Sequence, residues 1–182
     1  SIYSHSDLSD TRERASFEME KMKGVNLRDL ALYLDRTEET WEEIFTAYRE
    51  KIHSKSIRRS QSFRSNVFWL DMFEKTQKRV KETNISCGKT VGEFTERFRE
   101  FCHERDSSNN TDWLHGDLHF ANMFYDLHYR ELKLIDPRGD LCGDLFYDLA
   151  KLNHSVNGNY DCIDSQLYYF DQNGEVKYFM NE

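Results

Sequence analysis

The sequence contains few residues that interrupt helices. Proline occurs once, at Pro137, and glycine occurs only eight times in 182 residues. Because proline and glycine break or end helices, this scarcity favours long helices. No apolar run approaches the roughly 18 residues that a transmembrane helix needs, and the first residues show no signal-peptide pattern. We therefore expect a cytoplasmic protein built mainly from helices.

Positive charge and paired cysteines are also scarce. Lys and Arg total 25 against 33 Asp and Glu, which gives a net charge of −8. Nucleic acids and anionic membranes attract net positive surfaces, so we expect neither as a partner. A small anionic ligand held by a metal ion remains compatible with this charge. The four cysteines form no CxxC pair, which disfavours zinc or thioredoxin-type chemistry and favours reduced thiols.

Aromatic side chains, by contrast, make up 14% of the sequence and can supply a packed core. Several segments carry apolar residues at helical spacing, and Asn26 and Thr37 are placed to cap the first two. These predicted helices span residues 27–34, 37–53, 66–82, 90–105 and 143–156. Alternation and apolar runs predict strands at 15–21 and 130–137. The turn signal QNGE within 165–179 predicts a hairpin there, with a helix followed by a tail as the alternative.

The segment HGDLHFANMFYD, residues 115–126, mixes acids, histidines and an amide with apolar residues. On a strand, His115, Asp117 and His119 would share one face, which would suit a zinc hydrolase. The sequence supplies no clear third histidine nearby, however, and Gly116 weakens a strand. A purely structural interpretation has His115 and Asp117 hydrogen-bonding a buried turn.

Phosphoryl transfer is the third interpretation of this segment. That chemistry needs an aspartate that orients a hydroxyl and accepts its proton. It also needs an amide oxygen and a second carboxylate that bind magnesium against nucleotide phosphates. Asp117, Asn122 and Asp136 supply these groups in that order, and the last follows the apolar run of LKLIDPRGD. The ordered set is more specific than any of its members.

The pattern HGDLHFANMFYD, followed by LKLIDPRGD and GDLFYDLAKL, resembles the aminoglycoside phosphotransferase and choline kinase superfamily. The resemblance is strong over residues 113–152 and looser over residues 16–30. It implies an α+β, mainly helical fold: the C-terminal lobe of a protein-kinase-like fold with a short catalytic-loop hairpin. Residues 1–23 would be a remnant of the N-lobe and hinge strand, and residues 24–182 the helical C-lobe. Within that lobe the resemblance assigns a catalytic loop to 113–126 and a metal-binding strand to 131–137.

The resemblance also implies roles for individual residues. Asp117 would be the catalytic base, and Asn122 and Asp136 would bind Mg²⁺. His115 and Asp148 would support the catalytic loop, and His119 would stand where the family often has a histidine, near the acceptor. The hinge backbone would face the adenine of ATP, the expected phosphoryl donor. That hinge comprises Glu20, Lys21 and Met22.

The sequence departs from the family pattern in two respects. No Gly-rich loop or lobe precedes residue 24, so we expect a fragment that is inactive by itself and exposes an apolar surface open to self-association. Arg138 follows Asp136 where the family often has an acid. A guanidinium disfavours cationic acceptors and favours a sugar, polyol or sugar phosphate. Alternatively, Arg138 pairs with Asp140 or Asp144. The expected function is an ATP-dependent small-molecule kinase, with a non-catalytic, pseudokinase-like binding module as the alternative.

Overall fold

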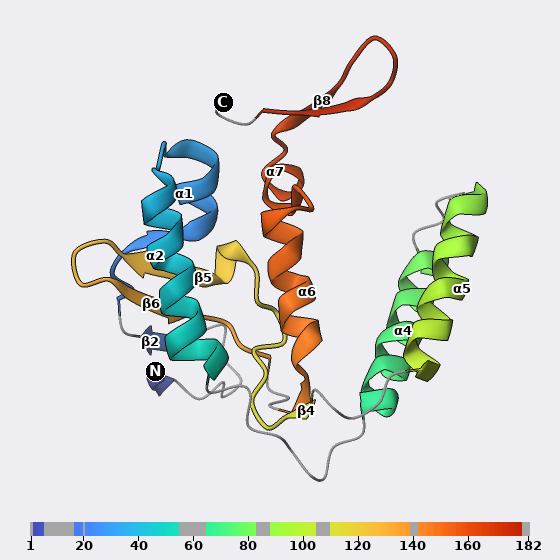
Figure 1. Ribbon diagram of the computed structural model, residues 1–182, viewed down its shortest axis with the longest axis horizontal. Helices are drawn as coiled ribbons and strands as arrows, with labels where there is room; N and C mark the ends of the chain where they lie inside the picture. The colour runs from blue at the N-terminus through green and yellow to red at the C-terminus, as the bar shows by residue number, and fades with distance from the viewer. Residues whose placement is uncertain are drawn as a thin grey trace, which may run out of the picture.

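The protein is an α+β chain in which just over half of the residues are helical and the sheets are small and antiparallel. Figure 1 presents the computed structural model. The structure describes residues 2–5, 17–19, 21–54, 65–82, 88–104, 110–138 and 142–179. Among these residues, no helix is both long and apolar enough to cross a bilayer. The expectation of a mainly helical α+β chain is therefore confirmed.

A three-stranded antiparallel sheet connects the two halves of the chain. It has the order β3 (Val25–Asn26), β5 (Met123–Asp126) and β6 (Glu131–Leu134). Strand β5 pairs with β6 with Met123 opposite Leu134, and it pairs with β3 with Tyr125 opposite Val25. The sheet therefore joins the segment that follows the HGDLH motif to the segment that leads into Asp136.

Two helices pack against this sheet and form the larger hydrophobic core. Helix α1 (Leu27–Tyr33) is capped by Asn26 and α2 (Glu38–Tyr48) by Thr37, as their sequences predict. A π-helical segment, η1 (Arg49–His53), extends α2. The core contains buried residues from both helices, the sheet, the HGDLH segment and the helix at residues 145–156. They are Leu27, Leu30, Ile44, Ala47, Tyr48, Leu118, Phe120, Met123, Tyr125, Leu132 and Leu152.

A helical hairpin carries the second, smaller core. Helices α4 (Ser65–Glu82) and α5 (Gly88–Glu104) pack together around Trp69, Phe73 and Cys102. The Trp69 indole donates a hydrogen bond of 2.8 Å to the buried carboxylate of Asp144. Tyr147 also packs on this cluster, so α6 (Leu145–Val156) contacts both cores. In Figure 1, α6 accordingly lies between the α2 side of the fold and the α4–α5 hairpin.

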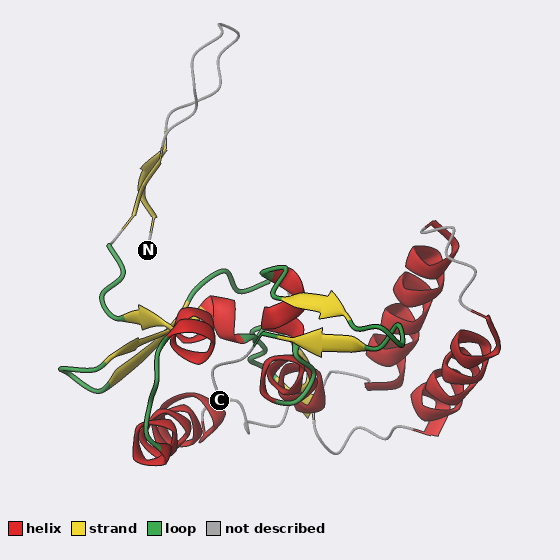
Figure 2. Cartoon of the chain, turned by 90° about the horizontal axis from the view of Figure 1, so that it is seen from above, coloured by secondary structure: helices red, strands yellow, loops and turns green. Residues whose placement is uncertain are grey.

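Short strands complete the chain. β4 (Asn110–Thr111) pairs with β7 (Gly143–Asp144), and helix α7 (Tyr160–Asp164) follows α6. The segment 165–179 forms the predicted hairpin, from β8 (Tyr168–Phe170) and β9 (Val176–Tyr178). The predicted strand at 15–21 corresponds to β2 (Phe17–Met19), which pairs with β1 (Ile2–His5). Figure 2 shows this pair projecting away from the helices.

Two predicted boundaries are wrong. The strand expected to run through residue 137 ends at Leu134, because Asp136 has a φ of +54° and leaves the extended conformation. The helix expected to begin at Gly143 begins at Leu145. Gly143 and Asp144 instead pair with β4, and the Asp144 carboxylate caps the helix by accepting from the Phe146 N–H at 2.9 Å.

Candidate active site

The two segments that flank the β5–β6 hairpin are joined at the site by three hydrogen bonds. The Ile135 N–H donates to the Asn122 carbonyl at 3.0 Å, and the Arg138 N–H donates to the His115 carbonyl at 2.8 Å. The His115 Nε2 atom lies 2.9 Å from the Ile135 carbonyl. Residues 115–122 and 135–138 therefore form one hydrogen-bonded unit. The unit contains Asp117, Asn122 and Asp136, the three residues that the sequence analysis selected.

His115 uses both of its ring nitrogens inside the protein. Its side chain is buried, and its Nδ1 accepts a hydrogen bond of 3.3 Å from the Asp117 N–H. The proton of the ring therefore lies on Nε2, which donates to the Ile135 carbonyl. Neither nitrogen is left to bind a metal. Among the described residues, no group of three or more His, Cys, Asp or Glu side chains is arranged to hold a metal ion.

Asp148 supports the HGDLH segment from α6. Its two carboxylate oxygens accept hydrogen bonds of 2.7 Å from the His115 N–H and 2.8 Å from the Gly116 N–H. The carboxylate is buried, and this burial raises the pKa of Asp148 although the two hydrogen bonds oppose the change. The sequence analysis expected a supporting role for this residue, and these contacts are of that kind.

Asn122 is held in one orientation by its amide nitrogen. The Nδ2 atom donates to the Asp117 carbonyl at 2.9 Å and lies 3.3 Å from His119 Nε2. The two contacts use the amide nitrogen, and no described residue donates a hydrogen bond to the amide oxygen. Amide and carboxylate oxygens are the donors that Mg²⁺ prefers, so the residue types at Asn122 and Asp136 fit this ion.

Asp136 lies in an unusual backbone conformation. Its φ of +54° falls in the left-handed region, which costs a non-glycine residue about 1 kcal/mol or more. The side chain is exposed, so packing within the core does not impose this conformation. Strained residues of this kind are concentrated at functional sites.

Asp117 forms an ion pair that the sequence analysis missed. The Lys151 Nζ atom, on α6, lies 2.8 Å from Asp117 Oδ1, and His119 Nε2 lies 3.7 Å from Oδ2. Partial burial would by itself raise the pKa of Asp117. The hydrogen bond and charge of Lys151, with the charges of His119 and Arg138, outweigh that effect and lower the pKa below 3.8. The carboxylate is therefore ionised at neutral pH.

The spacing between Asp148 and Lys151 in the sequence indicates on which face of the helix Lys151 lies. Lys151 follows Asp148 by three residues on the predicted helix at 143–156, and residues at this spacing lie on one face. Once Asp148 is assigned to the HGDLH segment, Lys151 must face the same segment. The spacing within GDLFYDLAKL therefore indicates the face on which Lys151 lies, but not its pairing with Asp117.

Arg138 and His119 lie beside Asp117, but they have different neighbours. The Arg138 guanidinium donates to the Tyr147 hydroxyl at 3.2 Å, whereas Asp144 accepts from Trp69 and Phe146. The expected pair of Arg138 with Asp144 does not form, and Asp140 lies outside the described residues. The His119 ring packs edge-on against Tyr160 at 5.4 Å between ring centroids.

The predicted hinge is described only in part. Lys21 and Met22 lie in an irregular segment between β2 and β3, and Glu20 lies outside the described residues. A role of this segment in nucleotide binding stays a prediction.

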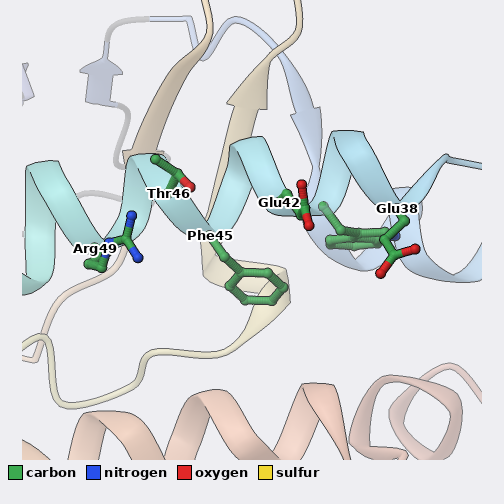
Figure 3. A pocket seen from close by; sticks show the side chains of 6 residues that line it. Glu38, Glu42, Phe45, Thr46 and Arg49 are labelled. Carbon is green, nitrogen blue, oxygen red and sulfur yellow. The ribbon is translucent and has the colours of Figure 1, made fainter.

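An open cavity of about 540 Å³ lies along α2. Figure 3 shows its lining side chains, which include Glu38, Glu42, Phe45 and Arg49. The Trp41 ring, which also lines it, stacks on Phe120 at 5.6 Å. None of the predicted site residues lines this cavity.

Comparisons with protein-family models, with curated proteins and with solved structures found no match for this chain. The resemblance to the aminoglycoside phosphotransferase and choline kinase superfamily therefore rests on the motifs themselves.

Proposed function

We propose that the protein is a phosphotransferase that moves the γ-phosphoryl group of ATP to a hydroxyl of a small acceptor. The observation that carries this proposal is the hydrogen-bonded unit of residues 115–122 and 135–138. Its hydrogen bonds join the two segments that carry Asp117, Asn122 and Asp136. Phosphoryl transfer requires these groups together, because its catalysis consists largely of positioning and charge neutralisation.

Asp117 orients the acceptor in this mechanism. Its Oδ1 is paired with Lys151, so Oδ2 is the oxygen that accepts a hydrogen bond from the attacking hydroxyl. The hydroxyl oxygen forms a bond to the γ-phosphorus as the bond from that phosphorus to the bridging oxygen breaks. The hydroxyl proton passes to Asp117 and then to solvent. A carboxylate with a lowered pKa is a weak base, and it suffices because the hydroxyl loses its proton late in a loose transition state.

Asn122 and Asp136 are the proposed magnesium ligands. A bound Mg²⁺ ion would neutralise charge on the nucleotide phosphates. The protein's own contribution is to fix the donors: the contact of Asn122 Nδ2 with the Asp117 carbonyl orients the amide, and the backbone of Asp136 is held in its left-handed conformation. His115 and Asp148 keep the segment in place.

One observation favours a second function, a non-catalytic binding module. In such a module Lys151 would neutralise Asp117 permanently, and the ion pair of 2.8 Å would be purely structural. The two functions differ in whether Asp117 is needed for turnover.

The deciding experiment measures transfer of labelled γ-phosphate by the full-length gene product to a panel of sugars, polyols, sugar phosphates and amino alcohols. We expect Asp117→Asn to lower kcat by about a thousandfold while binding of magnesium and nucleotide is retained. Asp164→Asn is the matched control, because Asp164 is exposed and pairs only with Arg28 among the described residues. Turnover of Asp117→Asn near that of the control would exclude Asp117 as the base. Absence of transfer to every acceptor would favour the binding module.

A further inference from the structure

Two cations beside Asp117 have hydrogen-bond donors to spare. The Lys151 ammonium contacts Asp117 Oδ1 at 2.8 Å, and no other described residue accepts from it. Arg138 donates to the neutral Tyr147 hydroxyl at 3.2 Å, and no carboxylate in the described part of the chain pairs with its guanidinium. An ammonium and a guanidinium each carry more N–H donors than one contact uses. Both groups can therefore bind a further acceptor.

Both cations act on the Asp117 carboxylate, because the charges of Lys151 and of Arg138 both stabilise its ionised form. The Arg138 side chain lies directly over Gly116, where an added Cβ atom would be only 2.9 Å from the Arg138 Cβ. Gly116 immediately precedes Asp117, to which Lys151 is paired. Gly116 has a φ of +79°, so the backbone turns here without a side chain that would separate Arg138 from Asp117.

The positions of the two cations are fixed by the fold. Lys151 is on α6, one turn after Asp148, which is bonded to the backbone of His115 and Gly116. The Arg138 N–H is bonded to the His115 carbonyl. The backbone of Arg138 and the helix that carries Lys151 are thus both bonded to the same loop, and the aliphatic part of the Arg138 side chain lies against Gly116.

We propose that Lys151 and Arg138 form an oxyanion subsite beside Asp117, which takes a phosphoryl or carboxylate group of a ligand. This inference rests on the proposed function, because it names the chemistry that reaches Asp117. A guanidinium matches two oxygens of such a group, and an ammonium supplies a compact charge. The oxyanion can come from the acceptor, as in a polyol phosphate or sugar phosphate, or from the phosphoryl group in transfer.

In the free protein, the Asp117 carboxylate pairs with the Lys151 ammonium, so it competes with the ligand for this cation. An arriving oxyanion takes the spare donors of Lys151 and Arg138, and the Asp117 carboxylate repels it. Removing the charge of Asp117 should therefore strengthen anion binding. A purely structural ion pair predicts no such gain, so the direction of this effect is diagnostic.

The experiment measures binding of inorganic phosphate to the full-length gene product by isothermal titration at low ionic strength. We expect Asp117→Asn to tighten binding by about tenfold, since the competing charge is partly screened by solvent. Adding Lys151→Met to Asp117→Asn should reverse this gain in affinity. Adding Arg138→Met to Asp117→Asn should likewise weaken phosphate binding by about tenfold. Lys78→Met is the matched control, because Lys78 is exposed and pairs with Glu82 on α4. Lys151→Gln and Arg138→Gln replace these variants if the methionine forms do not fold.

Phosphate binding that survives the loss of either cation, or an absence of phosphate binding, overturns the inference. The source of the oxyanion is distinguished by saturating the protein with a nonhydrolysable ATP analogue and magnesium. If phosphate still binds, the subsite takes the oxyanion of the acceptor. If phosphate is excluded, the subsite takes the transferring phosphoryl group.

This binding test is independent of turnover. Phosphate binding through both cations without any phosphoryl transfer would refute the proposed function and leave the subsite. Transfer without such binding would refute the subsite alone.

Discussion

The contact between Asp148 and the HGDLH segment allows a quantitative prediction. Asp148→Ala removes the acceptor of two backbone N–H groups, those of His115 and Gly116, at 2.7 and 2.8 Å. A hydrogen bond to a charged group contributes about 1.5–3 kcal/mol, so two of them contribute about 3–6 kcal/mol. The burial that raises the pKa of Asp148 offsets part of this gain. We expect a net loss of about 3 kcal/mol in the free energy of unfolding.

Urea and thermal unfolding measure this loss. A change of about 3 kcal/mol corresponds to roughly 6–12 °C in Tm for a chain of this size. Asp148→Asn keeps one acceptor oxygen and should lose about half as much. Asp29→Ala is the matched control, since Asp29 also lies in the first turn of a helix but its side chain is 52% exposed. Asp29→Ala should lower the free energy of unfolding by about 0.5 kcal/mol.

The pH dependence gives a second readout of the same contact. The pKa of Asp148 in the folded protein lies above 3.8, so the folded protein binds this proton at a higher pH than the unfolded chain. Relative to Asp148→Asn, the wild type should be most stable below pH 3.8 and lose stability as the pH rises through the folded pKa. In the unfolding test, the reasoning is refuted if Asp148→Ala lowers the free energy of unfolding by no more than Asp29→Ala does.

Two further changes test the geometry around the site. Gly116→Ala should cost about 1–3 kcal/mol on chemical unfolding, because Gly116 has a φ of +79° and an added Cβ atom would press on Arg138. At Gly92 on α5 an added Cβ atom would meet open space, so Gly92→Ala should raise the free energy of unfolding by about 0.5–1 kcal/mol. Equal effects of the two substitutions would contradict the local geometry. Burial, with the charge of Asp148, raises the pKa of Tyr48 from 10.0 to about 12. The wild type should therefore lose stability relative to Tyr48→Phe as the pH rises from 10 to 12, and parallel stability curves would refute this assignment.

Local sequence rules predicted the helices and their caps. Asn26 and Thr37 cap α1 and α2 as expected, and the QNGE turn joins β8 to β9. These features depend on residues a few positions apart, so a single sequence contains the necessary information. The boundary at Gly143 was wrong because β4, which is distant in sequence, pairs with β7. Asp144 also caps α6, so the local sequence and the pairing of β4 with β7 agree on the later start.

The types and order of the candidate site residues came from the sequence, but their contacts did not. The motifs selected Asp117, Asn122 and Asp136 without showing that hydrogen bonds join their segments. The left-handed backbone of Asp136 was not foreseen either, because neither its residue type nor its neighbours require it.

The sequence by itself determined the helical character of the chain, the caps and the set of groups suited to phosphoryl chemistry. Only the tertiary structure decided that Lys151 pairs with Asp117 and that Arg138 lies over Gly116. The physical reason is that side-chain contacts between distant segments depend on how helices and strands pack. The packing of α6 against the HGDLH segment places Lys151 at Asp117, and this packing arises from burial summed over the whole core.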